Sequence, residues 1–167
     1  MAIIEKFPYW SIIKENFIET ILFDVLIGNQ DRHTFNWMLL FKEHHVIFSP
    51  IYDNGASLGF RLDDKQLLDY LTNTHKMHKY VRQAKVKAGL FEKKSVKAKL
   101  VVTTFNARYP DSTARFFTKL QHIDMKAYHD FIEKTLLLSD AQKQWLHQIV
   151  GLRRDYMVAW REGDECI

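Results

Sequence analysis

Three side chains of the types that phosphoryl transfer requires lie in the N-terminal third of this chain. Asp31 and Asn36 are separated by four residues, and Asp53 follows after two short apolar segments. Transfer of phosphate from ATP needs an acidic group that positions or deprotonates the attacking hydroxyl, and oxygen ligands that hold Mg²⁺ on the phosphates. We therefore take Asp31 as the candidate catalytic base and Asn36 and Asp53 as candidate ligands of Mg²⁺ and ATP.

The segment between Asn36 and Asp53 has the pattern of a β-hairpin. Residues 37–41 and 46–48 are apolar and β-prone, and the polar residues 42–45 separate them. A hairpin of this size returns Asp53 to the neighbourhood of Asn36, where their side-chain oxygens can share one Mg²⁺. The Asp-x-x-x-x-Asn spacing and the Asp-Asn-Gly triplet are weak signals separately, and the hairpin that joins them strengthens both.

The same segment resembles a known family of kinases. Residues 27–36, which read IGNQDRHTFN, and residues 50–53, which read PIYD, are similar to the catalytic lobe of HipA-like serine/threonine kinases. The resemblance covers roughly residues 17–60. It implies Mg-ATP as cofactor, a protein substrate, and a toxin–antitoxin setting with a DNA-binding, antitoxin-like partner. The Asp-Arg-His-x-x-Asn element is also similar to phosphatidylinositol 3- and 4-kinases, so a lipid-kinase-like lobe is the alternative.

The residues around Asp31 are interpreted as supports of the loop. We expect Asn29 to form a turn hydrogen bond. We expect Arg32 to pair with an acid or a phosphate, and His33 to hold the loop by packing beneath Asp53. Asp24, in the preceding helix, is expected to face solvent. In kinase-like lobes the basic and histidine positions of this loop are architectural, so neither Arg32 nor His33 is assigned to acid–base catalysis.

The residues after Asp53 depart from the protein-kinase pattern. Asn54 stands where the Asp-Phe-Gly motif has phenylalanine, so a movable phenylalanine switch is not inferred. Asn54-Gly55 is also a pair that tolerates positive φ values, and a simple turn explains it adequately.

Length and composition favour one globular domain over residues 1–167. The chain is 47% hydrophobic and long enough for a substantial core. The single cysteine, Cys166, excludes an intrachain disulfide, which fits a cytoplasmic setting. We find neither a signal peptide nor an apolar run approaching the ~20 residues of a membrane span, so we expect a soluble protein that does not associate with membranes.

The charge distribution allows two interpretations of one basic tract. The formal net charge is +4 at a pI of about 9.1. Against one acid, Glu92, the tract 76–99 carries the basic residues Lys76, Lys79, Arg82, Lys85, Lys87, Lys93, Lys94, Lys97 and Lys99. The tract is either a solvated helical face with a turn at Gly89, or a docking surface for a polyanion or an acidic protein. Direct binding of nucleic acid is not expected.

The fold is predicted to be mainly α-helical, that of a kinase-like C-lobe. Its one short hairpin, near residues 37–49, is predicted to join the catalytic loop with Asp31 and Asn36 to the metal motif with Asp53. Apolar periodicity, capping residues and breakers predict helices at 11–27, 63–73, 76–88, 95–108, 111–120, 124–137 and 139–163. Ser11, Asp63 or Asp64, Asp124 and Ser139 are the predicted starts of four of them, and Gly28 and Gly163 are predicted stops.

The phosphate-binding half of a kinase is not found in this sequence. A complete kinase holds ATP between this lobe and a β-rich N-lobe with a glycine-rich loop and a lysine. Residues 1–16 are too few for such a lobe, and no G-x-G-x-x-G is present. We therefore expect a C-lobe that stands alone, belongs to a split kinase or comes from a truncated gene, with weak or no activity by itself and an N-lobe protein or antitoxin-like protein as partner. The alternative is a non-catalytic, kinase-derived binding module.

Overall fold

Helices account for most of the described chain. The computed structural model describes residues 2–43, 45–87 and 95–164. The helices are α1 (Ala2–Glu5), α2 (Trp10–Ile27), α3 (Asp64–Thr72), α4 (Thr74–Arg82), α5 (Ala98–Arg108), α6 (Pro110–Gln121), α7 (Met125–Lys134) and α8 (Asp140–Glu162). The strands are β1 (Leu39–Lys42), β2 (His45–Phe48), β3 (Lys85–Val86) and β4 (Val96–Lys97). The mainly helical fold class is as predicted.

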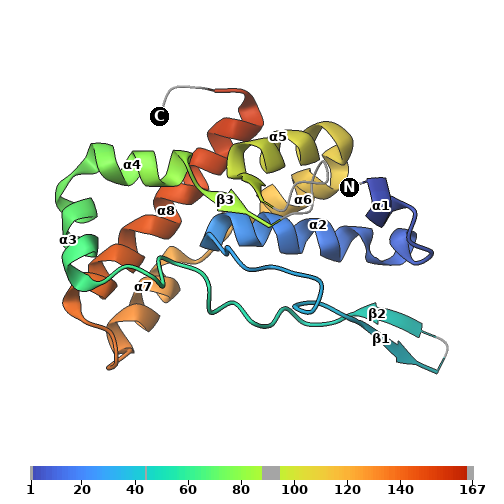
Figure 1. The fold of residues 1–167 in the computed structure, drawn as a ribbon, viewed down its shortest axis with the longest axis horizontal. Helices are drawn as coiled ribbons and strands as arrows, with labels where there is room; N and C mark the ends of the chain where they lie inside the picture. Colours follow the sequence, from blue (N-terminus) through green and yellow to red (C-terminus); the bar gives the residue numbers. More distant parts are fainter. Residues whose placement is uncertain (1, 44, 88–94, 165–167) are drawn as a thin grey trace.

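The core forms where α2 packs against α5, α6 and α8 (Figure 1). Ile18 and Leu22 of α2 are fully buried, as are Phe105 of α5 and Ile149 of α8. Apolar residues recur around α2 at spacings that cover a wide face, so the helix contacts neighbours on several sides. Helix α2, which leads into the loop that carries Asp31, is therefore anchored in the centre of the domain.

Gly28 ends α2 in the left-handed conformation, as predicted. Its φ is 65°, and its N–H donates to the Asp24 and Val25 carbonyls. A Cβ at this position would lie 1.8 Å from Nη1 of Arg153, which belongs to α8. Gly28 thus serves both the turn into the loop and the close approach of a buried guanidinium.

The hairpin lies where the sequence predicts it. β1 and β2 pair antiparallel, with Leu39 opposite Phe48 and Lys42 opposite His45. In Figure 1 the hairpin projects beyond the helices, and the chains leading to and from it run side by side below α2. The loop before β1, which carries Asp31 and Asn36, and the Asp53 segment after β2 are therefore brought together at the base of the hairpin.

Capping predicts several helix ends correctly. The Asp63 side chain accepts from the Gln66 N–H in a capping box at the start of α3, and Ser139 and Gln142 form another at α8. Asp124 caps α7 by accepting from the Ala127 N–H. These short-range signals are reliable because the cap hydrogen bonds satisfy donors that the first turn leaves free.

The predicted helix 76–88 is wrong in extent, and so is the expectation of only one hairpin. α4 ends at Arg82, and Lys85–Val86 forms a strand that pairs antiparallel with Val96–Lys97. Val86 and Val96 are buried, and β-branched residues favour this extended, packed arrangement. The predicted helix 95–108 accordingly begins later, at Ala98. The predicted turn at Gly89 lies outside the described residues, as do Glu92, Lys93 and Lys94.

Three further helix boundaries differ from the prediction. α2 begins at Trp10 after Tyr9, which makes no side-chain cap, so Ser11 is not the N-cap. α6 begins at Pro110, whose fixed φ suits a first helical position, and α7 ends at Lys134 before the expected position 137. None of the helices in the described part of the chain has the length and apolar character of a membrane span.

Gly28→Ala is expected to destabilise the fold by about 2 kcal/mol or more. Left-handed backbone costs an L-residue roughly 1–2 kcal/mol, and the contact with Arg153 adds overpacking of roughly 1–3 kcal/mol. Gly163→Ala is the matched control, because Gly163 has φ 82° but open space around its Cβ position. The free energies of unfolding in urea measure both effects. Equal losses for the two variants would contradict the proposed steric role of Arg153.

Candidate functional site

The site is built around a buried ion pair between Arg32 and Asp24. Arg32 Nε lies 2.9 Å from Asp24 Oδ2, and Arg32 Nη2 lies 2.9 Å from Asp24 Oδ1. The two side chains are 2% and 1% exposed. The expectation that Asp24 faces solvent is therefore wrong, whereas the expectation that Arg32 pairs with an acid is confirmed.

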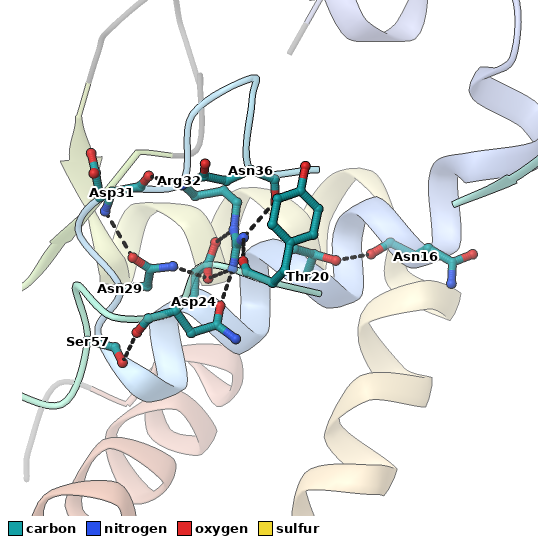
Figure 2. A network of polar contacts seen from close by, with 10 residues as sticks. Asn16, Thr20, Asp24, Asn29, Asp31, Arg32, Asn36 and Ser57 are labelled. Carbon is teal, nitrogen blue, oxygen red and sulfur yellow. Dashed lines mark hydrogen bonds and ion pairs between the residues drawn. The ribbon is translucent and has the colours of Figure 1, made fainter. Parts of the chain in front are cut away.

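The remaining N–H groups of Arg32 bind both segments that carry the candidate ligands. Nη1 donates to the Asn36 carbonyl and to the Tyr52 carbonyl, each at 2.8 Å, and Nη2 donates to Asn54 Oδ1 at 2.6 Å. All five guanidinium donors thus have acceptors. Figure 2 shows this guanidinium at the centre of the network, with Asp24 and Asn36 among its partners. Arg32 therefore fixes the end of the loop at Asn36 and both neighbours of Asp53.

The protonation of Asp24 reflects two opposing influences. Burial raises the pKa of Asp24, while the hydrogen bonds and charge of Arg32 and the Asn29 amide act to lower it. Asn29 Nδ2 donates to Asp24 Oδ1 at 3.0 Å. Breaking such a buried pair leaves an uncompensated charge in the interior, which is strongly destabilising.

Hydrogen bonds hold the backbone of Asp31 in place, and its carboxylate is partly exposed to solvent. Asn29 Oδ1 accepts from the Asp31 N–H at 2.9 Å, which confirms the predicted turn bond of Asn29. Asn36 Nδ2 donates to the Asp31 carbonyl at 3.0 Å. In Figure 2 the Asp31 carboxylate points away from the Arg32 network. The loop geometry thus presents the candidate base outward on a fixed backbone.

Lys87, which follows β3, forms an ion pair with the Asp31 carboxylate. The Lys87 and Asp31 side chains are 28% and 49% exposed, so the pair lies at the surface of the site. The hydrogen bond from Lys87 lowers the pKa of Asp31, burial acts in the opposite direction, and the charge of Lys87 adds to the lowering. Asp31 is consequently ionised at neutral pH, which is the form that accepts a proton.

Asn36 and Asp53 flank the Arg32 guanidinium from two segments. Asn36 is buried, and Asp53 is exposed with a positive φ of 55°. A non-glycine residue in this conformation stores strain, which persists only where neighbouring contacts hold it. Here Arg32 binds the residues on both sides of Asp53. A Mg²⁺ shared by the side-chain oxygens of Asn36 and Asp53 remains a prediction.

His33 does not support the loop in the predicted way. Its side chain is exposed and its ring contacts Phe35, so it does not pack beneath Asp53. The expected packing fails because the interior beneath the loop is filled by Arg32 and Asp24. A second link between the two segments comes from Tyr52, whose hydroxyl donates to the Phe35 carbonyl at 2.8 Å.

Two residues of the site were missed from the sequence. Asp24 lies seven positions after Phe17 and three after Ile21, both buried, so helical spacing alone places it on the apolar face. That spacing is the signal that could have found it. Lys87 had no such signal, because its partner lies far away in the sequence and the segment around it was predicted as helix.

The fold and the sequence similarity together make this a kinase-like protein. The chain is 27% identical over 154 residues to the serine/threonine-protein kinase CtkA of Helicobacter pylori, covering 89% of this chain and 46% of that protein. The crystal structure of a Helicobacter pylori proinflammatory kinase, CtkA, matches with a TM-score of 0.77 at 22% identity, covering 92% of this chain and 56% of that one. No protein-family model matches the sequence. The chain spans about half the length of the relative it matches.

Asp24→Asn is expected to lower the free energy of unfolding by about 3–5 kcal/mol, because it leaves the Arg32 charge buried without a counter-charge. Asp69→Asn is the control. Asp69 pairs with Lys76 at the surface, where the two side chains are 54% and 49% exposed and the pair contributes at most about 1 kcal/mol. Urea denaturation of both variants measures the difference. Similar small losses would show that the buried pair does not hold the loop.

Lys87→Met is expected to raise the pKa of Asp31, because the hydrogen bond and charge that favour the carboxylate are removed. In the parent protein this pair stabilises the fold above the unfolded-state pKa of Asp31, and its contribution disappears as pH falls through the lower folded-state value. Carbon-detected NMR titration of the Asp31 carboxyl measures the shift. Lys97→Met, in the neighbouring strand, serves as the control. An unchanged Asp31 titration in Lys87→Met would contradict the assigned pair.

Proposed function

We propose that this chain is the C-terminal catalytic lobe of a HipA-like serine/threonine protein kinase, forming one domain over residues 1–167. Asp31 orients the acceptor hydroxyl and accepts its proton, and Asn36 and Asp53 hold the metal and the ATP phosphates. The observation that carries the proposal is the Arg32 clamp, which ties the Asn36 carbonyl to the carbonyl of Tyr52 and the side chain of Asn54. This clamp holds together the two segments whose ligands must act on one ion.

The chemistry of the donor set fits Mg²⁺. The ion prefers oxygen ligands and is commonly bound by one or two protein side chains together with waters and substrate phosphates. Within the described ranges no group of three or more His, Cys, Asp or Glu side chains is placed to hold a metal ion. Asn36 and Asp53 supply the small oxygen set that a metal shared with ATP needs. When bound, ATP would supply the phosphoryl group, and Mg²⁺ would neutralise the negative charge of the phosphates.

The state of Asp31 supports its role as base. Asp31 has a lowered pKa and a half-exposed carboxylate, so an acceptor hydroxyl can reach it in its ionised form. Lys87 pairs with one oxygen of this carboxylate, so the ammonium group must share the carboxylate or move aside when an acceptor approaches. The same ion pair favours the second candidate function, a kinase-derived lobe that binds a partner without catalysis, because it neutralises the base. A lipid-kinase-like lobe is the remaining alternative for the acceptor class.

The wider setting follows from the proposed family. Because the chain spans 46% of the length of the kinase it resembles, we propose that the phosphate-clamping N-lobe is supplied by another polypeptide segment or partner. A cytoplasmic toxin–antitoxin system with an antitoxin-like partner is the corresponding biological context. Positioning and charge stabilisation provide most of the rate in phosphoryl transfer, so this lobe alone should be weakly active at best.

The test is transfer of radiolabelled phosphate from Mg-ATP to protein. The chain is assayed alone and with any N-lobe product that a neighbouring reading frame encodes. Transfer is expected only from the combination. Asp31→Asn should lower it by about 10²–10⁴-fold, the usual contribution of a general base. Asp53→Asn should also weaken binding of Mg-ATP.

Asp130→Asn, at an exposed position on α7, is the matched control and should retain full transfer. Robust transfer by the chain alone would refute the two-lobe requirement. Full activity of the Asp31→Asn combination would remove Asp31 as the base. Absence of transfer in every combination would favour the non-catalytic module.

A further inference from the structure

A basic pocket lies beside the candidate base. It has a volume of about 700 Å³ and lies between α3, α4, β3, α8 and the start of the loop that carries Asp31. Its described lining includes Gly28 and Gln30 from the loop and Arg153 from α8. Four lysines also line it: Lys76, Lys79, Lys85 and Lys87. Pockets of this volume accommodate small ligands or a few peptide residues.

Arg153 is the unusual member of this lining. It is 2% exposed, yet its Nε and Nη1 atoms have no hydrogen-bond partner among the described residues. Its guanidinium carbon lies 5.6 Å from the centre of the Tyr80 ring. Burial lowers the pKa of Arg153, and Tyr80 opposes this. Buried guanidinium donors without acceptors are strongly unfavourable, so their presence at a pocket wall indicates a site prepared for an anion.

The position of Arg153 is imposed by the fold. The guanidinium packs against Gly28, where any Cβ would collide with it. It is therefore held at the end of α2, directly before the loop that carries Asp31. Because the guanidinium is packed this tightly in the interior, it cannot turn toward solvent to recover its hydration.

Most of the charges that line the pocket are positive. The lining contains the five cations just named and one acid, Asp69. Lys76 pairs with Asp69 at 2.8 Å, and Lys87 pairs with Asp31. Within the described part of the chain, Lys79 and Lys85 have no acidic partner and are exposed. Lys79, Lys85 and Arg153, which has two donor atoms without acceptors among the described residues, thus line one pocket.

We propose that this pocket binds the phosphate group of a phosphorylated serine or threonine in a peptide, with Arg153 as its floor and Lys79 and Lys85 as its walls. A phosphate monoester carries a charge of about −1.5 to −2 and strong acceptor oxygens, which match a planar Arg donor set and flanking lysines. The pocket is larger than one phosphate, and the amides of Gln66 and Gln83 on its lining suit the polar backbone of a peptide.

The location suggests what the phosphate site does. Lys87 lines the pocket and also pairs with Asp31, and Gln30 lines the pocket and directly precedes Asp31. A phosphopeptide held here lies next to the candidate base. The pocket would then be an acceptor subsite that selects segments already phosphorylated, and this role rests on the proposed function. Binding of the phosphate group by the pocket does not depend on the proposed function.

The experiment is isothermal titration calorimetry of the whole chain without ATP. The probes are a short peptide with one central phosphothreonine, the same peptide without phosphate, inorganic phosphate and an inositol bisphosphate. The phosphopeptide is expected to bind at least about tenfold more tightly than each of the others. Equal binding of the two peptides would overturn the proposal. Tighter binding of the inositol bisphosphate would overturn the assignment to a peptide.

Variants locate the site. A Lys79→Ala and Lys85→Ala double variant is expected to weaken phosphopeptide binding at least about tenfold. A Lys126→Ala and Lys134→Ala double variant, which removes two exposed charges from α7, should bind like the parent. Arg153→Met should abolish binding. The lysine variants keep the test decisive if Arg153→Met fails to fold, and equal binding by the two double variants would overturn the proposal.

The two proposals fail separately. Asp31→Asn removes the candidate base and leaves Arg153, Lys79 and Lys85 in place, so it should still prefer the phosphorylated peptide over the unphosphorylated one while losing phosphoryl transfer. Selective binding without transfer in any combination would contradict the proposed catalytic function alone. Transfer without selective phosphopeptide binding would contradict the pocket alone.

Discussion

The candidate site depends on one buried guanidinium. Arg32 uses all its donors on Asp24, the carbonyls of Asn36 and Tyr52, and the side chain of Asn54. A buried charge is tolerated only when it is paired and fully hydrogen-bonded, so these acceptors must remain in place for the domain to stay folded. The geometry of a loop with few apolar contacts of its own is thereby coupled to the stability of the core helix α2.

The second buried arginine shows the opposite balance. Arg153 is as deeply buried as Arg32, but two of its nitrogen atoms have no acceptor among the described residues. Both guanidinium groups lie near the end of α2, one below the loop and one against Gly28. One holds the loop, and the other faces a pocket. Sites that bind charged ligands commonly retain such unfavourable groups, because optimising them for stability would remove the function.

Under the proposed function, this chain supplies the helical half of a kinase-like catalytic apparatus. The matching region spans 46% of the relative, and in two-lobed kinases the base and metal ligands come from the helical lobe while the other lobe clamps the phosphates. Asp31, Asn36 and Asp53 all belong to segments supported by α2 and the β1–β2 hairpin. Under the proposed function, contacts within this domain therefore position the segments that carry the candidate base and metal ligands.

The sequence by itself determined what depends on neighbouring residues: the end of α2 at Gly28, the capping boxes at Asp63 and Ser139, and the β1–β2 hairpin. These follow from backbone conformation and local hydrogen bonds. Only the tertiary structure decided the roles of Asp24, Lys87 and Arg153. Helical spacing places Asp24 on the buried face of α2, but only the fold shows that Arg32 pairs with it there. Lys87 contacts Asp31, which lies 56 residues earlier in the chain, and the surroundings of Arg153 are formed by α4 and Gly28. Electrostatic contacts between distant segments leave no periodic pattern in a sequence, since they depend on which elements meet in space.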